Sequence, residues 1–171
     1  MVEQYGDAVY REVQRWSLKF RLLVCGLCVL GAAGGAIPTA MVLMRGEAGW
    51  RALLVGVGCG VLVPIGVGLL IWVFRLETEV RVDGVYIRCV PFHRGFKRFE
   101  AAEVSEHHAR KYRPILEYGG WGIRRGWKGR AYNVSGNEGV QLVLRDGRRV
   151  LIGSARPCEL DAAIGSIMHA N

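Results

Sequence analysis

The stretch LLVCGLCVLGAAGGAIPTAMVLM, residues Leu22–Met44, contains 23 consecutive residues without a charged side chain. A second run of 23 uncharged residues extends from Ala52 to Phe74. At a rise of ~1.5 Å per residue, each run would form a helix roughly 34 Å long, enough to cross the about 30 Å hydrocarbon core of a bilayer. Neither run has the polar face that a helix of this length normally shows in a soluble core. The sequence therefore predicts two transmembrane helices, 22–44 and 52–74.

A cleaved secretory signal is the alternative interpretation of the first run. The small residues of GAIPTA, residues 35–40, resemble a cleavage region. However, the run is longer than the usual apolar core of a signal peptide, and the segment before it contains Glu3, Asp7 and Glu12. We therefore expect an uncleaved span that follows a short N-terminal segment, residues 1–21.

Basic residues indicate the orientation of the two predicted spans. The loop between the spans contains only Arg45 and Arg51. The basic residues on the other side are Arg11, Arg15, Lys19, Arg21, Arg75, Arg81, Arg88, Arg94, Lys97 and Arg98. Because short segments rich in Lys and Arg stay in the cytoplasm, we expect both termini there and the connecting loop outside.

The predicted spans contain glycine at helix-packing spacing and no Asp, Glu, Lys, Arg or His. Transporters and proton pumps need polar or ionisable groups in the membrane, so these spans indicate an anchor. Gly31 and Gly35 form one small-xxx-small pair, and Gly56 and Gly60 form another. Such pairs allow two helix backbones to approach closely, although glycine is also common in membrane helices generally. We expect a tight hairpin, which could also associate into a homo-oligomer.

After residue 75 the periodicity of the sequence changes to that of β-strands. TEVRVDGVYIRCVPF, residues 78–92, alternates on both sides of Asp83-Gly84, which is a strong hairpin signal. Further strand patterns occur in WGIR, AYNVS, VQLVL and RVLIG, separated by turns that contain glycine. Residues 101–112 fit either an extended edge strand or a short helical turn followed by a strand, and we favour the second interpretation.

The chain ends in a pattern typical of an amphipathic helix. Pro157 suits a first helical position, and Leu160, Ile164 and Ile167 then fall on one face. The fold class that follows is an α+β membrane protein, in which a two-helix transmembrane hairpin precedes a cytoplasmic domain, residues 75–171. We expect this domain to be a small antiparallel β-barrel or sandwich of seven or eight short strands, with the C-terminal helix as its cap.

This arrangement of two spans, meandering strands and a C-terminal helix resembles the bacterial pleckstrin-homology-like proteins. The run EYGGWGIR…GRAYNVSGNEGVQLVLRDGRRVLIGS…P.EL, within Glu117–Leu160, is similar to an uncharacterised bacterial membrane family that carries such a domain. The resemblance implies a β-barrel with a capping helix in a protein of the bacterial inner membrane, and it transfers no catalytic residue. Other pleckstrin-homology-like domains bind phospholipid headgroups, peptides or neighbouring subunits, but a shared fold does not fix function.

The segment Glu117–Val140 contains seven glycines, and a phosphate-binding loop is one interpretation of them. A loop of the Walker type requires Gly-x4-Gly-Lys-Ser/Thr at the start of a helix. Here Lys128 lies one residue late, and no Ser or Thr follows it. The glycines therefore fit the turns of β-hairpins better than a nucleotide site.

Basic and aromatic residues in the same segment form the candidate binding surface: Trp121, Arg124, Arg125, Trp127, Lys128 and Arg130. Beside an anionic leaflet, each basic residue contributes roughly 1 kcal/mol of attraction within a Debye length of about 8–10 Å. A solvated cationic rim is the competing interpretation. Residues 75–171 carry 17 Lys and Arg against 11 Asp and Glu, and this positive charge could attract nucleic acid. However, no aromatic platform for stacking bases is interleaved with the basic residues, so we do not expect nucleic acid as a partner.

Patterns for catalysis and metal binding are missing from the sequence. His107 and His108 are adjacent and would point to opposite faces of a strand, so we predict no metal site and no cofactor. The leading hypothesis is a non-enzymatic, membrane-anchored binding or scaffold module that contacts protein partners, its own copies or anionic lipid headgroups. The alternative is an enzyme or enzyme subunit with a small-molecule site in the barrel mouth, around Glu117, Trp121 and Tyr132.

Overall fold

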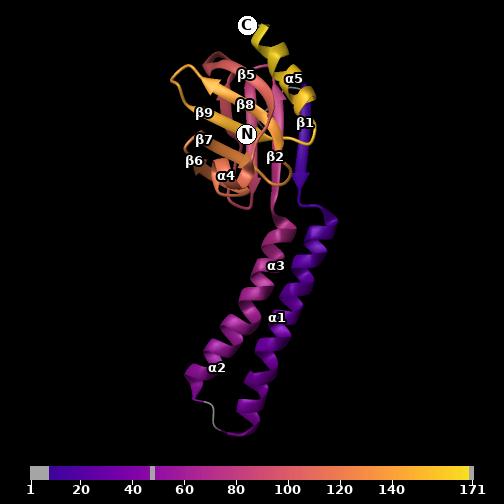
Figure 1. The fold of residues 1–171 in the computed structure, drawn as a ribbon, viewed down its shortest axis with the longest axis vertical. Helices are drawn as coiled ribbons and strands as arrows, with labels where there is room; N and C mark the ends of the chain where they lie inside the picture. The colour runs from indigo at the N-terminus through magenta and orange to yellow at the C-terminus, as the bar shows by residue number, and fades with distance from the viewer. Residues whose placement is uncertain (1–7, 47–48, 170–171) are drawn as a thin grey trace, which may run out of the picture. The chain divides into compact units, whose positions relative to one another are not determined.

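The computed structural model describes residues 8–46 and 49–169, and these divide into two compact units. A helical unit consists of Trp16–Val73, and a β unit combines residues 8–15 with residues 74–169. The helical unit is thus inserted, in sequence, between the first and second strands of the β unit (Figure 1). Glu3 and Asp7 lie outside the described residues.

The first apolar run forms one long helix, α1 (Leu18–Met44). The hydroxyl of Ser17 accepts a hydrogen bond from the backbone N–H of Phe20 at 3.3 Å and caps its N-terminus. Within the described residues, α1 is the only helix that is long and apolar enough to cross a membrane, a test that a signal sequence near the N-terminus would also pass. The sequence prediction of a span-length helix is therefore confirmed for the first run.

The second apolar run is divided, which corrects the expectation of a second continuous α-helix of span length. It comprises α2 (Trp50–Val57), a π-helical turn η1 (Gly58–Leu62) and α3 (Val63–Val73). Pro64 has no N–H to donate to the preceding turn, and the N–H of Val63 bonds to the carbonyl of Gly58, one residue further back than in an α-helix. The missing donor at Pro64 accounts for a wider turn at this point.

The four glycines of the predicted packing motif lie where the two apolar segments contact each other. A Cβ atom on Gly35 would lie 2.3 Å from the Cα of Gly60, so only glycine fits on either side. A Cβ on Gly56 would meet the hydroxyl of Thr39 at 2.2 Å, and one on Gly31 would lie 3.7 Å from Pro64. The small residues therefore serve close contact within the hairpin itself.

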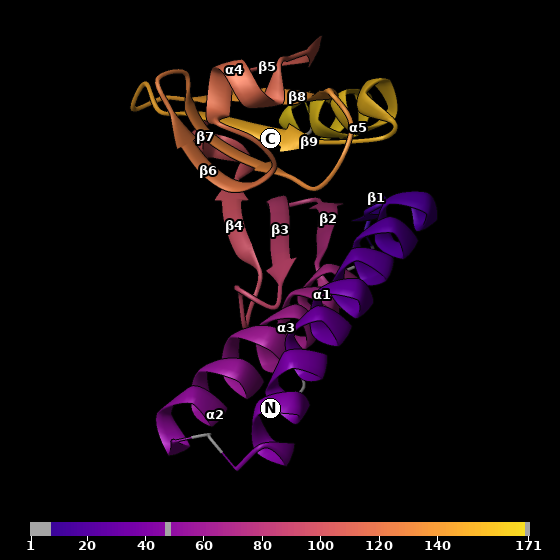
Figure 2. The same ribbon diagram turned by 60° about the horizontal axis from the view of Figure 1, so that its bottom comes forward.

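The first sheet of the β unit has the order β1–β2–β3–β4, and all its strands are antiparallel. Its strands are β1 (Tyr10–Arg15), β2 (Arg75–Arg81), β3 (Gly84–Val90) and β4 (Lys97–Glu100), and Figure 2 shows the last three side by side. The predicted hairpin at Asp83-Gly84 joins β2 to β3. Strand β1 was not predicted, because its buried face carries the polar residues Glu12 and Gln14 and therefore shows no apolar alternation.

A buried carboxylate holds β1 in place. Glu12 is only 8% exposed and accepts hydrogen bonds from the hydroxyls of Tyr10 and Ser154, both at 2.6 Å, and from the N–H of Ala155 at 2.8 Å. Because Ser154 and Ala155 directly precede the C-terminal helix, these bonds tie the N-terminal strand to the C-terminal part of the unit. A fragment that starts at residue 75 would lack this strand.

The outer face of the first sheet carries an arginine–glutamate ladder, which consists of Arg11, Arg75, Glu77, Glu79, Arg81 and Arg88. Glu77 accepts from Arg75 at 2.7 Å and from Arg88 at 2.8 Å. Burial alone would raise the pKa of Glu77, but the bonds from Arg88 and Arg75 outweigh it and lower that pKa. The ladder thus neutralises each carboxylate with two arginines.

The second sheet has the order β5–β8–β9–β7–β6. Its strands are β5 (Val104–Lys111), β6 (Gly122–Gly126), β7 (Gly129–Asn133), β8 (Glu138–Leu144) and β9 (Arg149–Gly153). A short 3₁₀ turn, η2 (Ala101–Glu103), precedes β5, as we expected for this segment. A short helix that was not predicted, α4 (Pro114–Tyr118), ends at Gly119, whose φ of 73° favours glycine.

Two features of the sheets bear on the predicted antiparallel barrel or sandwich: one parallel pair departs from both, and the two open sheets agree with the sandwich rather than the barrel. Strands β7 and β9 are parallel, because β8 and β9 form a hairpin that inserts β9 beside β7. In addition, the described residues form two open sheets without a closed barrel, with β1 and β4 at the edges of one and β5 and β6 at the edges of the other. Strand β4 has only four residues, so its free edge offers few backbone hydrogen bonds to another strand.

The core lies between the two sheets. Val85 and Ile87 of β3 and Tyr132 and Ile152 of the second sheet are at most 1% exposed. On the opposite face of the second sheet, a smaller cluster contains Tyr112, Tyr118, Ala131 and Leu151. The C-terminal helix α5 (Pro157–His169) buries the predicted face of Leu160, Ile164 and Ile167 against β5 and β8 of the second sheet and β2 and β3 of the first.

Candidate functional site

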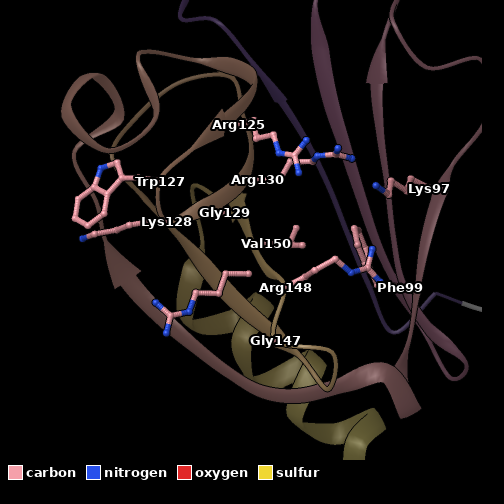
Figure 3. Close-up of a pocket in the computed structure, with 11 residues that line it drawn as sticks. Lys97, Phe99, Arg125, Trp127, Lys128, Gly129, Arg130, Gly147, Arg148 and Val150 are labelled. Atoms are coloured by element: carbon pink, nitrogen blue, oxygen red, sulfur yellow. The ribbon is translucent and has the colours of Figure 1, made fainter.

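A cavity of about 440 Å³ opens in the β unit between strand β4 and the β6–β7 and β8–β9 hairpins (Figure 3). We call it the basic pocket. Six of its lining side chains are cationic, and none is acidic. Its lining residues are Lys97, Phe99, Arg125, Trp127, Lys128, Gly129, Arg130, Gly147, Arg148, Arg149 and Val150.

Strand register places residues from both sheets at this cavity. Lys97 and Phe99 pair with Ile87 and Val85, so they lie on the inner face of the first sheet. On the second sheet, Arg130 pairs with Val150, and both lie two residues before Tyr132 and Ile152, so they share the face of these core residues. The sheets do not pair at this end of the sandwich within the described residues, and the opening between their edges is where the cationic side chains gather.

Gly129 brings the two hairpins of the second sheet together. Its φ is +111°, and a Cβ atom there would lie 2.2 Å from the carbonyl oxygen of Arg149. Glycine therefore permits both the left-handed backbone and the close approach of β7 to the start of β9. As a result, Lys128 and Arg130 come close to Arg148 and Arg149, although the two pairs are separated in sequence.

A buried tyrosine organises the inner part of the pocket. The hydroxyl of Tyr132 accepts a hydrogen bond from Lys97 at 3.0 Å and one from Arg130 at 3.3 Å. Figure 3 shows Arg125 and Arg130 extending toward Lys97, whereas Trp127 and Lys128 lie at the opposite rim. One neutral oxygen thus orders two cations without neutralising the charge of either.

Carboxylates compensate only part of the charge of the pocket. Lys128 pairs with Glu117 at 3.2 Å, and Arg148 pairs with Asp146 at 2.5 Å. In the part of the chain that the structure describes, no carboxylate lies within ion-pair distance of the other four cations, which are Lys97, Arg125, Arg130 and Arg149. The cavity therefore concentrates positive charge.

A nearby histidine responds to this charge. His93 lies in the β3–β4 connection, and its ring is 6.1 Å from that of Tyr132 between centroids. Burial lowers the pKa of His93, and the charges of Lys97 and Arg130 lower it further. His93 is thus a neutral neighbour of the pocket whose titration reports on the electrostatic potential there.

The structure separates the six residues of the predicted binding surface. Arg125, Trp127, Lys128 and Arg130 line the basic pocket, but Arg124 and Trp121 do not. Neighbouring residues on a strand point to opposite faces, so Arg124 turns away from Arg125 and donates to the carbonyl of Trp121 at 3.0 Å. The indole N–H of Trp121 donates in turn to the carbonyl of Gly136 at 2.9 Å.

Sequence analysis missed half of the cations of the pocket. Lys97 comes from a different sheet, and only the register of β4 shows that it faces inward. Arg148 and Arg149 follow the turn at Asp146-Gly147, and RDGRR was interpreted only as a hairpin turn with a strand after it. A run of two arginines directly after a predicted turn is the signal that could have drawn attention to this loop.

The residues of the alternative enzyme site, Glu117, Trp121 and Tyr132, each bond to different partners. Glu117 accepts from Arg110 at 2.8 Å and from the N–H of Arg113 at 2.9 Å, and it pairs with Lys128. Burial would raise the pKa of Glu117, but these partners lower it to about 2. A carboxylate that is ionised and neutralised in this way is a poor general base. Trp121 and Tyr132 have other partners: Trp121 donates to Gly136, and Tyr132 accepts from Lys97 and Arg130.

The two adjacent histidines also separate. His107 and His108 occupy consecutive positions on β5, and Nδ1 of His107 lies 2.7 Å from a carboxylate oxygen of Asp161 on α5. Within the described residues, no group of three or more His, Cys, Asp or Glu is arranged to hold a metal ion. The contact of His107 therefore serves to dock the C-terminal helix onto β5.

Comparison with known proteins gives a family. A model for a family of unknown function, DUF6141, matches residues 53–170, which is more than half of the chain. The chain therefore belongs to this family of unknown function, as its resemblance to an uncharacterised family led us to expect. No curated protein matches the chain.

Proposed function

We propose that the protein is a membrane-anchored, non-enzymatic binding module whose basic pocket takes up an anionic group. In this proposal α1 and the second apolar segment both cross a bacterial inner membrane, and both termini lie in the cytoplasm. The length and composition of α1 and the distribution of basic residues support this placement. The two sheets and the C-terminal helix support a pleckstrin-homology-like architecture for the β unit.

The observation that carries the proposal is the charge of the basic pocket. Six cations surround one concavity, and four of them lack a carboxylate partner within the described residues. A cleft lined by charges of one sign focuses the electrostatic field and raises the local concentration of oppositely charged ligands. An anion in the pocket would also relieve the repulsion between the cations. A solvated rim would instead present such residues on a convex surface.

Anionic lipid headgroups and free anions are both available to a domain near the cytoplasmic leaflet. The contacts of Gly31, Gly35, Gly56 and Gly60 lie within the hairpin, so they support an anchor more than a self-association motif. A protein partner with an acidic segment could use the same pocket, and it would then compete with small anions.

A thermal-shift experiment on the full-length protein tests the proposal. We choose the full chain because strand β1 belongs to the β unit, and we reconstitute it in phosphatidylcholine nanodiscs to exclude anionic lipid. Inorganic phosphate should raise the Tm of the β unit, because a ligand that binds only the folded state stabilises it. Arg125→Gln should reduce the shift, whereas Arg124→Gln, with the same charge change on the same strand, should not. Equal shifts in the two variants, or no shift at all, would contradict the proposal.

A labelling experiment tests the orientation. Cys158 is an exposed free thiol on α5, in the β unit. An impermeant maleimide should fail to modify it in intact cells and should modify it after the membrane is opened. Modification of Cys158 in intact cells would place the β unit outside the cytoplasm.

A further inference from the structure

We infer that the ligand of the basic pocket carries two phosphate groups. This inference rests on the proposed function, since it names the chemical class of the anion that the pocket would bind.

The uncompensated charge of the pocket matches two phosphates better than one. Of the six lining cations, Lys128 and Arg148 each pair with a carboxylate, which leaves four formal charges without one in the part of the chain that the structure describes. A phosphomonoester carries about −1.5 to −2 at pH 7, so two such groups carry about −3 to −4. A single phosphate would leave about half of the charge unpaired.

The cations are arranged around the cavity and come from three separate elements. Lys97 belongs to β4, Arg125 and Arg130 to the β6–β7 hairpin, and Arg148 and Arg149 to the end of the β8–β9 hairpin. The Tyr132 hydroxyl already orients Lys97 and Arg130, so these two cations form a pre-organised pair. Arg148 and Arg149, on the β8–β9 hairpin, are exposed. An arginine can donate two parallel hydrogen bonds to a phosphate, so these two side chains suit a phosphate group.

The size and walls of the cavity also fit a molecule larger than one phosphate ion. Its volume of about 440 Å³ lies within the range of about 300–1,000 Å³ that is typical of small-molecule sites. Phe99 and Val150 are 3% and 5% exposed and contribute apolar surface, while Trp127 is 80% exposed at the rim. These groups can contact the carbon frame that joins two phosphates.

Two sources could supply this chemistry, namely a soluble bisphosphorylated metabolite or a membrane lipid with two phosphate groups. The recognition would be the same, because the pocket contacts the phosphates in both cases. The experiment therefore compares one phosphate with two, first in solution and then in a lipid.

In the first arm, isothermal titration calorimetry measures inorganic phosphate and inorganic pyrophosphate binding to the full-length protein in phosphatidylcholine nanodiscs. We expect pyrophosphate to bind about tenfold more tightly or better, because each additional charge-assisted hydrogen bond corresponds to roughly a tenfold gain or more. Increasing salt should reduce this preference, since the contacts are electrostatic.

In the second arm, the nanodiscs contain either cardiolipin, which has two phosphates, or phosphatidylglycerol at the same total charge. If the natural ligand is a lipid with two phosphates, cardiolipin should weaken the apparent binding of pyrophosphate, and phosphatidylglycerol should not. If both lipid mixtures leave pyrophosphate binding unchanged, the ligand is a soluble molecule. Either result agrees with the inference, and the two results identify the source.

Variants separate the pocket from general surface charge. Lys97→Gln and Arg149→Gln should each lower the affinity for pyrophosphate about tenfold, because each removes a charge that has no carboxylate partner among residues 8–46 and 49–169. Arg145→Gln is the matched control, since Arg145 is exposed near the same β8–β9 turn but does not line the pocket. Retention of the Tm in each variant shows that it is folded.

The outcomes distinguish this inference from the proposed function. Equal affinity for phosphate and pyrophosphate, or equal losses in Arg149→Gln and Arg145→Gln, would overturn the two-phosphate inference and leave an unselective anion site. Failure of both anions to bind, in every nanodisc composition, would overturn the proposed function as well.

Discussion

The arginine–glutamate ladder and the basic pocket use the same side chains in opposite ways. In the ladder, Glu77 and Glu79 are each 6% exposed, and each is surrounded by two arginines. In the pocket, four of the six cations have no carboxylate partner within the described residues. Both regions lie in the same β unit, and the formal net charge of the chain, +8, does not distinguish them.

The difference shows which arginines serve the fold and which are available to a ligand. A ladder arginine exchanges water for a carboxylate, so its removal takes one of two cationic partners from a buried charge. A pocket cation raises the electrostatic energy of the cations beside it, and the fold tolerates this repulsion because solvent screens it. Stability measurements should therefore separate the two regions by the sign of the effect.

We expect the largest effect from Glu77→Gln in the ladder. The substitution leaves Arg75 and Arg88 without their shared carboxylate, and it should lower the free energy of unfolding by about 1–3 kcal/mol, discounted because both arginines are partly exposed. Urea unfolding of the full-length protein, followed by tryptophan fluorescence, measures this change. The control is Glu138→Gln, whose exposed pair with Lys111 should contribute less than about 0.5 kcal/mol. Equal losses would remove the distinction between ladder and surface pairs.

The next effect concerns acid stability and Glu117, the carboxylate that holds one cation of the pocket. Because the pKa of Glu117 is lowered from its usual 4.5 to about 2, its contribution is fully present above pH 4.5. As the pH falls from 4.5 towards 2, the folded protein loses this contribution, which amounts to about 1–2 kcal/mol after screening. Glu117→Gln should therefore flatten the dependence of the Tm on pH in this window. An unchanged slope would show that Glu117 is not paired in solution.

A smaller effect of the opposite sign is expected in the basic pocket. Arg149→Gln in the ligand-free protein should leave the free energy of unfolding unchanged or raise it by no more than about 0.5 kcal/mol, because it relieves repulsion between the cations of the pocket. The Tm should follow the same direction. The effect should disappear at high salt. A clear destabilisation of this variant would mean that Arg149 has a structural partner, as the ladder arginines do.

The smallest effect is a shift in the titration of His93. Burial is the larger cause of the lowered pKa of His93, but anion binding should neutralise Lys97 and Arg130, which lower it further, so that this pKa rises. NMR spectra of protein with labelled histidine, recorded against pH with and without pyrophosphate, measure the shift. His108 is exposed on β5 and serves as the internal control. Equal shifts at both histidines would indicate a general effect of ionic strength.

Several local elements could be predicted from the sequence because neighbouring residues determine them. The alternation around Asp83-Gly84 gives the β2–β3 hairpin, and the apolar face of residues 157–169 gives α5. Four of the six predicted binding residues line the pocket, and all four lie at Arg125–Arg130, where the β6–β7 hairpin turns. The interruption of the second apolar run at Gly58–Leu62 was missed, since hydrophobicity alone does not report a change in hydrogen bonding.

The sequence by itself determined the apolar runs, the switch to a two-residue period, the C-terminal amphipathic helix and the positive charge. These are properties of composition and short-range periodicity. Only the tertiary structure decided that β1 completes the first sheet, that β9 lies parallel to β7 and that Lys97 faces Arg130 across the basic pocket. The reason is that strand pairing and register join residues far apart in the chain, and a change of one residue in register would turn each of these side chains to the other face.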